Sequence, residues 1–445
     1  GMRMKKNIVS IMVLSMVTAF TFMAAGCSAK QTSQPAEKEA GSAEQTQASS
    51  GENSEENVKI GLMLQLSGSN PAVSKEDLLG CQIIADIINN ETDYNLPLAK
   101  TAGLPNLNGA KVEIVVGDVA TNDAAMSECE RLITEEGVSA FAGVIGSSGV
   151  KIAATAFEKY GVPYVANASS PSLTSSGYEY LVRIFPDDRI YCEGVFEFIK
   201  ELNETENAGI KTVALCSEDS EFGANITAIE EELTAEYGLE LVKTVKYSAT
   251  ATNVTSEVLQ LKDANSDVVM MSSYTSDAIL FMQTFKEQNY MPKLLCAQRG
   301  GFSYNEIFDS LGKDMDYVYN SSPWASDLSV PNTKLLRELF AKESGGAELQ
   351  EGCARIMTDF YAACLAINQA GTTDATAIME EFRKGIDIPD DQKWLSIDIK
   401  IDETGQNLES SVLVMQALDG SYKTVYPGDV ASAKYIYPVP GWDKR

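Results

Sequence analysis

Small polar residues follow two short apolar runs of this chain, in positions where they could bind an anion. Ser147 and Ser148 follow the run VSAFAGVIG, and Asn167, Ala168 and Ser169 follow the run PYVA. The two adjacent serines also open an amphipathic helical pattern, so their hydroxyls and the first free N–H groups of that helix suit a carboxylate. The alternative for a serine at a helix start is a cap that binds no ligand.

A second group of polar and aromatic residues follows three apolar runs further along the chain. Ligands of open parallel sheets bind beyond the carboxyl ends of the strands, which makes these residues candidates for the same site. The two aromatic residues among them either pack internally or form a pocket wall. The group comprises Ser217, Glu218, Asp219 and Phe222 after TVALC, Ser272, Ser273 and Tyr274 after DVVMM, and Gln298 and Arg299 after KLLCA.

Catalysis is not expected from these residues. The chain has no His, which excludes Ser-His-Asp and Cys-His catalysis and His-based metal sites. The motifs GxGxxG, GxxxxGK and GxSxG are absent. A glycosidase-type carboxylate pair stays open at this level, although no pair stands out. The sequence therefore predicts a binding protein without metal or cofactor.

The surrounding chain alternates apolar runs with amphipathic helical patterns from residue 58 onward. This alternation predicts parallel sheets covered on both faces, in two α/β lobes of similar composition. Within the first helical pattern, Ser74 and Asp77 have the spacing of a capping pair. Near the end, residues 395–406 and 410–427 alternate as strands do, and Asp402 and Gly405 mark a turn between them.

The N-terminal segment predicts export. We interpret Gly1 as left by cloning, and residues 1–26 as a signal peptide with a basic start and an apolar run. Ala24, Ala25 and Gly26 before Cys27 resemble a bacterial lipobox, which implies a lipid on Cys27. The alternative is an ordinary signal peptide with an incidental Cys. A lipid there would hold the protein on the outer face of the cytoplasmic membrane without a spanning helix.

Residues 27–57 would connect this anchor to the folded chain. They contain no aromatic and no branched aliphatic residue, so we expect a disordered tether.

The net charge of the chain is −28, which repels phosphate backbones, so nucleic-acid binding is not expected. The seven further cysteines are scattered singly, which predicts mostly buried free thiols.

The order of several motifs resembles a known family. The segments G-x-x-x-S-S, A-S-S-P-x-L-T and Y-L-V-R-x-x-P-x-D resemble the type I periplasmic-binding fold, and the nearest group in it is the branched-chain amino-acid (Leu/Ile/Val) substrate-binding lipoproteins of ABC transporters. The resemblance implies two doubly wound α/β lobes joined by three crossover strands. It implies one lobe from residues 58–185 and 325–408 and a second from 186–324 and 409–445.

The resemblance also implies roles for single residues. Ser147 would hold the α-carboxylate of an amino acid, Ser169 would contact the carboxylate and the ammonium group, and the backbone carbonyl of Asn167 would accept from the ammonium. The neighbouring Ser148 and Ala168 complete this part of the site. Phe222 and Tyr274 would contact the ligand from the second lobe, and Val73 falls where a Tyr often closes over the ligand side chain.

One position departs from the family pattern. The acidic partner of the ligand ammonium falls on Gln298, a neutral amide that cannot neutralise the charge. Either Asp277, Glu218 or Asp219 replaces it, or the ligand is not an ordinary α-amino acid. Arg299 beside it either meets a second carboxylate or lies exposed.

The expected function is therefore a solute-binding protein that clamps a small aliphatic amino acid, or a related carboxylic acid, and delivers it to an ABC permease. Closure on the ligand would create the form that the permease binds. The alternative is a sensor of the same fold for amides, urea or aromatic acids that signals to a partner protein.

Overall fold

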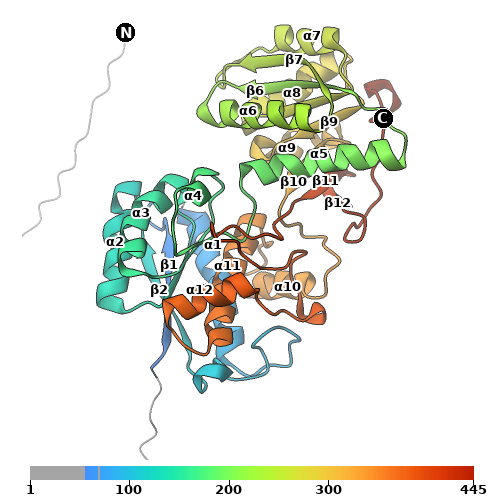
Figure 1. The fold of residues 1–445 in the computed structure, drawn as a ribbon. Helices are drawn as coiled ribbons and strands as arrows, with labels where there is room; N and C mark the ends of the chain where they lie inside the picture. Colours follow the sequence, from blue (N-terminus) through green and yellow to red (C-terminus); the bar gives the residue numbers. More distant parts are fainter. Residues whose placement is uncertain (1–55, 69–70) are drawn as a thin grey trace, which may run out of the picture. The chain divides into compact units, whose positions relative to one another are not determined.

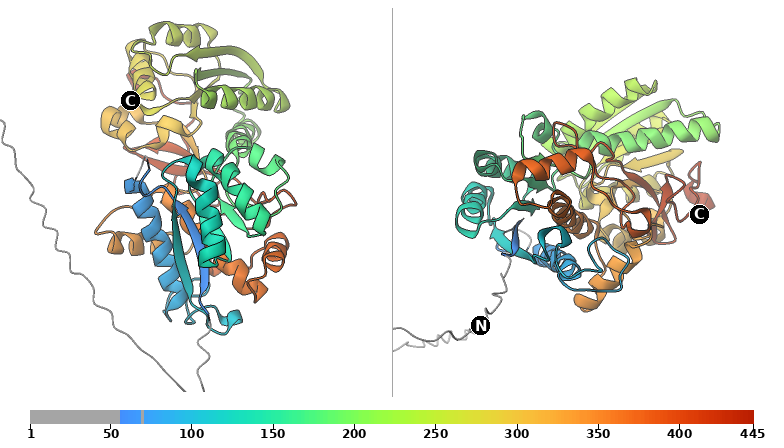
Figure 2. Two further views of the ribbon diagram at one scale, coloured as in Figure 1. Left: turned by 90° about the vertical axis from the view of Figure 1, so that its left-hand side faces the viewer. Right: turned by 60° about the horizontal axis from the view of Figure 1, so that its bottom comes forward.

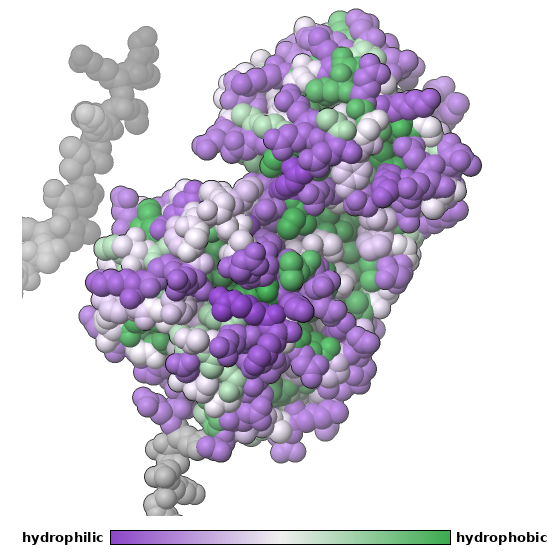
Figure 3. Space-filling view, in the orientation of Figure 1, coloured by the Kyte–Doolittle hydropathy of each residue, from purple (hydrophilic) through white to green (hydrophobic). Residues whose placement is uncertain are grey.

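The computed structural model describes residues 56–68 and 71–445, which contain two β-sheets with helices packed on them (Figures 1 and 2). The signal peptide, Cys27 and almost all of the expected tether lie outside the described residues. Figure 3 shows a predominantly hydrophilic surface, in keeping with the high net charge. Within the described residues, no helix is both long enough and apolar enough to cross a membrane.

The first sheet is parallel throughout. Its strands are nearly continuous apolar runs because both faces of the sheet are covered. The strand order is β2-β1-β3-β4-β5, with β1 (Val58–Leu64), β2 (Val112–Asp118), β3 (Ala140–Gly143), β4 (Tyr164–Ala166) and β5 (Leu181–Val182).

Neighbouring residues of these strands pack into different cores. Leu62 of β1 packs with α1 and α11 on one face, whereas Met63 packs with α2 and α3 on the other. This alternation follows from the two-residue period of a strand. The helices are α1 (Pro71–Asn89), α2 (Ala125–Arg131), α3 (Gly146–Tyr160), α4 (Ser172–Ser175), α10 (Thr333–Glu343), α11 (Glu351–Ala370) and α12 (Ala375–Lys384).

The second sheet is parallel from β7 to β10 and ends in an antiparallel hairpin. Asp419 and Gly420 form the turn of this hairpin with positive φ angles of 52° and 85°. The strand order is β12-β11-β10-β9-β8-β6-β7, with β6 (Thr212–Glu218), β7 (Glu240–Tyr247), β8 (Val268–Ser272), β9 (Leu294–Ala297), β10 (Tyr319–Ser322), β11 (Leu413–Leu418) and β12 (Ser421–Tyr426).

Helices cover both faces of the second sheet as well. One core contains residues of α5 and α6, and the other contains residues of α7, α8 and α9. The helices are α5 (Asp188–Thr205), α6 (Glu221–Glu236), α7 (Thr255–Ala264), α8 (Thr275–Glu287) and α9 (Glu306–Leu311). Short 3-10 or π turns complete the chain at η1 (Pro105–Leu107), η2 (Asn122–Ala124), η3 (Leu132–Glu136), η4 (Gly300–Ser303), η5 (Gly312–Met315), η6 (Asp390–Gln392) and η7 (Trp442–Lys444).

The chain passes between the two sheets three times: after β5, after β10 and before β11. The first and third passages run side by side, because Arg183 donates its N–H to the Gly405 carbonyl at 2.8 Å and its own carbonyl accepts from the Asn407 N–H at 2.8 Å. The two helix-covered sheets and the three chain passages between them agree with the predicted fold class of two doubly wound α/β lobes. The exact lobe boundaries stay a proposal.

Two local predictions need correction, and one helix was missed. Helix α1 begins at Pro71, a favoured residue for a first turn, so Ser74 and Asp77 are buried inside the helix and do not form a capping pair. Helix α5 was not predicted. Residues 395–406 alternate in burial as a strand would, yet they form only isolated bridges, between Gln406 and Arg183 and between Ile401 and Asn407. Ile401 also donates its N–H to the Phe382 carbonyl at 3.0 Å beside α12.

Two other local predictions are confirmed. The N–H of Gly405 donates to the Asp402 carbonyl at 3.2 Å, and Gly405 has a φ of 92°, so a turn forms there. The seven cysteines of the described residues are buried and free. Burial raises the pKa of the Cys129 thiol to about 12, which keeps it protonated and unreactive.

Candidate functional site

The first predicted polar cluster lies at the carboxyl ends of two neighbouring strands. Strands β3 and β4 pair in parallel, so the residues that follow them meet at one edge of the sheet. The N–H of Ser170 donates to the Ser147 hydroxyl at 3.2 Å, which joins the start of α3 to the loop after β4. The sequence prediction that these two segments are neighbours is therefore confirmed.

Helix α3 begins without a cap from its own chain. Its N-cap residue is Ile145, no side chain bonds to its first N–H groups, and its first turn contains no acidic residue. Ser147 is half-buried and Ser148 is exposed in this turn. The free N–H groups and the two hydroxyls together form a site of positive potential that suits one carboxylate.

Asn167 is fixed by two charged residues of α11. Its amide nitrogen donates to Asp359 Oδ2 at 3.0 Å, and its amide oxygen accepts from Arg355 Nη1. Arg355 also pairs with Glu351, with 2.5 Å between Nε and Oε1, and its side chain is 24% exposed. Arg355 is thus a partly accessible cation directly beside a predicted ligand residue.

Two buried acids lie near this arginine. Asp77 and Asp359 are 3% and 0% exposed, and one carboxylate oxygen of each has no hydrogen-bond partner within the described residues. Burial raises the pKa of Asp77 to about 7, and the charge of Arg355 opposes this shift. Burial likewise raises the pKa of Asp359, again opposed by Arg355. Both carboxyls therefore carry less negative charge near neutral pH than exposed acids do.

Arg183 holds the loop that carries Ser169. Its side chain is 1% exposed. It donates to the carbonyls of Ala168 and Ser170 at 3.2 and 2.7 Å, to the Thr174 hydroxyl at 3.0 Å, and to Gln406 Oε1 at 2.7 Å. The loop 168–174 is thereby tied to the first and third passages between the sheets. The carbonyl of Ser169 accepts from the N–H of Asp188, the first residue of α5, at 2.9 Å.

Two aromatic residues form a wall on the second sheet. The rings of Phe222 and Tyr274 have centroids 6.2 Å apart, and the Tyr274 hydroxyl lies 3.2 Å from the Ser220 hydroxyl. Tyr274 is 46% exposed, whereas Phe222 is half-buried. The structure therefore brings the two predicted aromatic contacts together at the starts of α6 and α8.

The three acids considered as partners for an ammonium group make contacts of their own. Glu218 is 0% exposed, and its carboxylate accepts from the N–H groups of Ser220 and Gly223 at 2.6 and 2.8 Å. Asp277 accepts from the Tyr247 hydroxyl at 2.6 Å. Asp219 is exposed and accepts from the Ala249 N–H at 3.2 Å, next to the edge strand β7.

Gln298 lies in a buried polar row. Ser217 pairs with Ser272 across β6 and β8. Ala297 of β9 pairs with Met271 and with Asn320, so the next residues, Gln298 and Ser321, continue the same line across the sheet from Ser272. Ser217 accepts from the Thr227 hydroxyl of α6 at 2.8 Å, so the row faces this helix. Gln298 and Ser321 are each 1% exposed, and so is Glu230, which follows Thr227 by one turn.

Glu230 and Gln298 are both buried beneath α6. Burial raises the pKa of Glu230 to about 8, and the Gln298 amide opposes the shift. Within the described residues, neither the amide nitrogen nor the amide oxygen of Gln298 has a hydrogen-bond partner. Its contact with a ligand stays a prediction.

Arg299 and Val73 are the two remaining residues considered from the sequence. Arg299 is not fully exposed: its guanidinium donates to Asp188 Oδ1 at 2.6 Å and lies 3.7 Å from the centroid of the Tyr191 ring. Val73 lies in the first turn of α1 with 45% of its surface exposed, one turn before Asp77. Arg299 thus meets a carboxylate of its own chain.

The structure brings Ser147, Asn167 and Ser169 together on the first sheet and Phe222 and Tyr274 on the second. Sequence reasoning missed Arg355 and Asp359 as neighbours of Asn167. A signal was available, because these two residues stand four apart in a helical pattern in which residues 353–367 are otherwise apolar except for Thr358. Within the described residues, no group of three or more Cys, Asp or Glu side chains could hold a metal ion.

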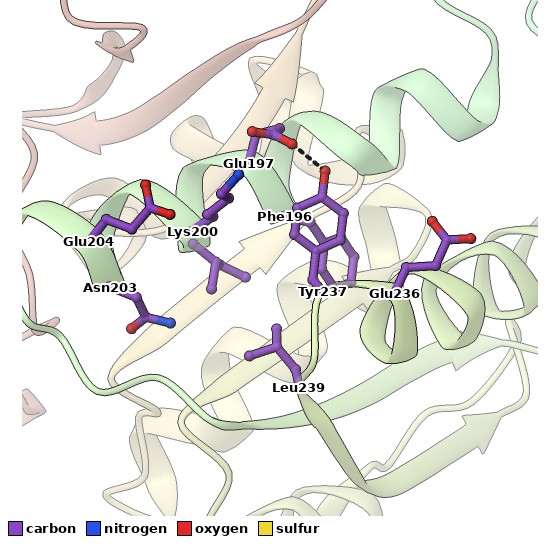
Figure 4. Close-up of a pocket in the computed structure, with 9 residues that line it drawn as sticks. Phe196, Glu197, Lys200, Asn203, Glu204, Glu236, Tyr237 and Leu239 are labelled. Carbon is purple, nitrogen blue, oxygen red and sulfur yellow. Dashed lines mark hydrogen bonds between the residues drawn. The ribbon is translucent and has the colours of Figure 1, made fainter.

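A pocket of about 500 Å³ lies elsewhere on the second sheet (Figure 4). It is lined by residues of α5, the end of α6 and Leu239 before β7, and the Tyr237 hydroxyl donates to Glu197 above it. Its residues lie at the amino ends of β6 and β7. The predicted ligand residues follow the carboxyl ends, so this pocket is not part of the candidate site.

Comparisons with known proteins agree with this arrangement. A family model described as periplasmic binding protein matches residues 57–421. The chain is 27% identical over 393 residues to the Leu/Ile/Val-binding protein homolog 7 of Brucella suis, covering 86% of this chain and 94% of the relative.

Two solved structures share the fold. A leucine-binding protein from Thermotoga maritima has a TM-score of 0.62 and 20% identity, covering 84% of this chain and 100% of that one. The branched-chain amino acid transporter substrate-binding protein of Streptococcus pneumoniae, solved with isoleucine, also has a TM-score of 0.62 and 20% identity, covering 82% and 98%.

Proposed function

Because the chain belongs to the periplasmic binding protein family, we propose that it is the solute-binding protein of an ABC importer. Its ligand is a small amino acid or a related small carboxylic acid. The observation that carries this proposal is the uncapped start of α3, where Ser147 and the adjoining loop 167–170 offer donors to one carboxylate. The substrate-binding relatives named above support the same reading.

Ligand contacts from both sheets support a clamp mechanism. Ser147, Ser148, Asn167, Ala168 and Ser169 would hold the carboxylate end. Phe222 and Tyr274, with Val73 and Gln298, would enclose the remainder. A ligand that contacts the residues of both sheets favours the closed form of the protein, and an ABC permease would bind that closed form.

Members of this family are exported, and we propose that Cys27 carries the lipid that keeps the protein on the outer face of the cytoplasmic membrane. A single lipid anchor and residues 28–57 would keep the binding domain near the permease. The ligand is bound and released chemically unchanged, since the site offers hydrogen bonds and aromatic surface without a nucleophile–base pair.

A thermal-shift screen tests this function. The purified protein is heated with a panel of L-amino acids, their amides and small carboxylic acids, because a ligand that binds the native state raises Tm. We expect at least one member with a carboxylate to raise Tm, with a Kd then measured by calorimetry. A panel in which no carboxylate stabilises the protein would contradict the proposal.

A further inference from the structure

The charges around the candidate site indicate what kind of carboxylic acid it takes. An α-amino acid brings an ammonium group as well as a carboxylate, and a desolvated ammonium requires a nearby carboxylate or a large cost in free energy. A neutral carbonyl accepts one hydrogen bond but does not neutralise the charge. The acids near the strand ends therefore decide whether an ammonium can be bound.

Three helices begin where ligand residues follow the strands, and two of these starts already hold a carboxylate of the protein. Glu218 accepts from two N–H groups at the start of α6 and from the Ser220 hydroxyl at 2.7 Å. Asp277 lies in the first turn of α8 and is 1% exposed. Helix α3 alone among these three has no acidic residue in its first turn. The start of α3 is thus open to an anion.

The acids that lie next to arginines are neutralised. Asp188 pairs with Arg299 at 2.6 Å, and Glu351 pairs with Arg355 at 2.5 Å. Asp187 caps α5 by accepting from the Ile190 N–H at 2.8 Å and lies 3.7 Å from Arg183. None of these pairs leaves a surplus negative charge for a ligand.

Three further acids of this region are buried. Asp77, Asp359 and Glu230 are at most 3% exposed, and burial raises the pKa of each. Within the described residues, Glu76, Asp118, Asp219 and Glu221 are acids of this region that have neither an arginine nor a lysine partner. Asp118 accepts from the Ser67 hydroxyl at 2.5 Å, and Asp219 accepts from the Ala249 N–H at 3.2 Å, next to the edge strand β7.

The candidate site contains several hydrogen-bond donors and one cation that could bind a carboxylate. The first turn of α3 presents free N–H groups and the hydroxyls of Ser147 and Ser148. Arg355 adds a guanidinium that is bonded to Asn167 and is partly exposed. We propose that the ligand is a small carboxylic acid without an α-ammonium group, such as a 2-oxo or 2-hydroxy acid. This inference rests on the proposed function as a solute-binding protein.

Matched ligand pairs test this inference by calorimetry. L-Leucine is compared with 4-methyl-2-oxopentanoate, L-phenylalanine with phenylpyruvate, and L-alanine with lactate and pyruvate. We expect the acid without the amino group to bind at least 100-fold more tightly in at least one pair. Equal or tighter binding of the amino acid in every pair that binds would overturn the inference and leave the proposed function standing. Failure of both members of every pair, and of the wider panel, would instead contradict the proposed function.

Single variants test which charged side chains near the site affect ligand binding. Arg355→Met should weaken binding of the preferred acid about tenfold, and Arg383→Met, at an exposed position on α12, should not change it. Glu76→Gln and Asp219→Asn should leave acid binding unchanged. If the wild-type protein bound an amino acid and either of these two variants no longer did, that carboxylate would be the ammonium partner and the inference would be wrong.

Discussion

At the scale of single residues, Ser147 combines a structural and a binding contact. Its hydroxyl oxygen accepts from the Ser170 N–H, which leaves its hydrogen free to donate to a ligand carboxylate. The residue thereby connects the uncapped start of α3 to the loop after β4. Ligand affinity should depend on this hydroxyl more strongly than the fold does.

We expect Ser147→Ala to weaken ligand binding by about 10- to 150-fold, since one hydrogen bond to a charged group contributes roughly 1.5–3 kcal/mol. Its Tm should change little, because Ser147 is only half-buried. Calorimetry of the two proteins measures the affinity, and Ser175→Ala on the exposed part of α4 is the control. An unchanged affinity would remove Ser147 from the site.

Arg183 is the residue on which the binding loop depends. Replacing it with Met should lower the free energy of unfolding by about 3–5 kcal/mol, because several buried acceptors lose a charged donor at once. Arg189→Met is the matched control. Arg189 forms ion pairs with Glu193, Glu232 and Glu236 on the surface, so its loss should cost less than about 1 kcal/mol. Urea unfolding compares the two, and equal losses would argue against the loop-holding role.

At the scale of elements, α6 covers a polar row where an apolar layer would be expected. Glu230 on this helix has a pKa near 8 in the folded protein, compared with 4.5 for an exposed Glu. The unfolded chain therefore ionises first as the pH rises. The stability of the wild-type protein should fall between about pH 4.5 and pH 8 through this group.

The variant Glu230→Gln should remove this pH dependence. Near pH 5 the two proteins should have similar stability, and near pH 8 the variant should be more stable by roughly 2–4 kcal/mol. Denaturant titrations at several pH values measure the difference, with Glu231→Gln at an exposed position as the control. Parallel pH profiles for wild type and Glu230→Gln would show that Glu230 is ionised in the folded state.

The loop after β9 supports the aromatic wall. Gly301 approaches Tyr274 so closely that an added Cβ would lie 2.1 Å from the Tyr274 carbonyl carbon. Gly301→Ala should therefore cost about 1–3 kcal/mol of stability and displace Tyr274, with weaker ligand binding. Gly428→Ala, where no atom lies within 4 Å, is the control. Normal affinity and stability of Gly301→Ala would contradict this placement.

At the scale of the whole molecule, the proposed clamp predicts a change of size. A ligand held by residues of both sheets should favour a more compact form, so the radius of gyration in small-angle scattering should decrease on saturation. Variants such as Ser147→Ala should need more ligand for the same decrease. An unchanged radius with a ligand of proven affinity would rule out closure as the mechanism.

Much of this architecture could be predicted because its signals are local. The strands and most of the helices follow from apolar runs and helical periodicity, and the neighbourhood of Ser147 and Asn167 follows from the parallel pairing of consecutive strands. The segment 395–406 shows the limit of such signals. Its alternating burial is real, but a strand also needs a partner along its length, and this segment has only isolated bridges. Partners are set by the packing of distant segments.

Composition, periodicity and the order of motifs were enough to predict the two α/β sheets, the family, the lack of His-based chemistry and the hydroxyls at the start of α3. Which charges meet became clear only from the packing of the folded chain. Arg355 reaches Asn167, Arg299 reaches Asp188, and Glu218 bonds to the start of α6. The physical reason is that electrostatic energies depend on distance and burial, and these are fixed only when segments far apart in the chain pack together.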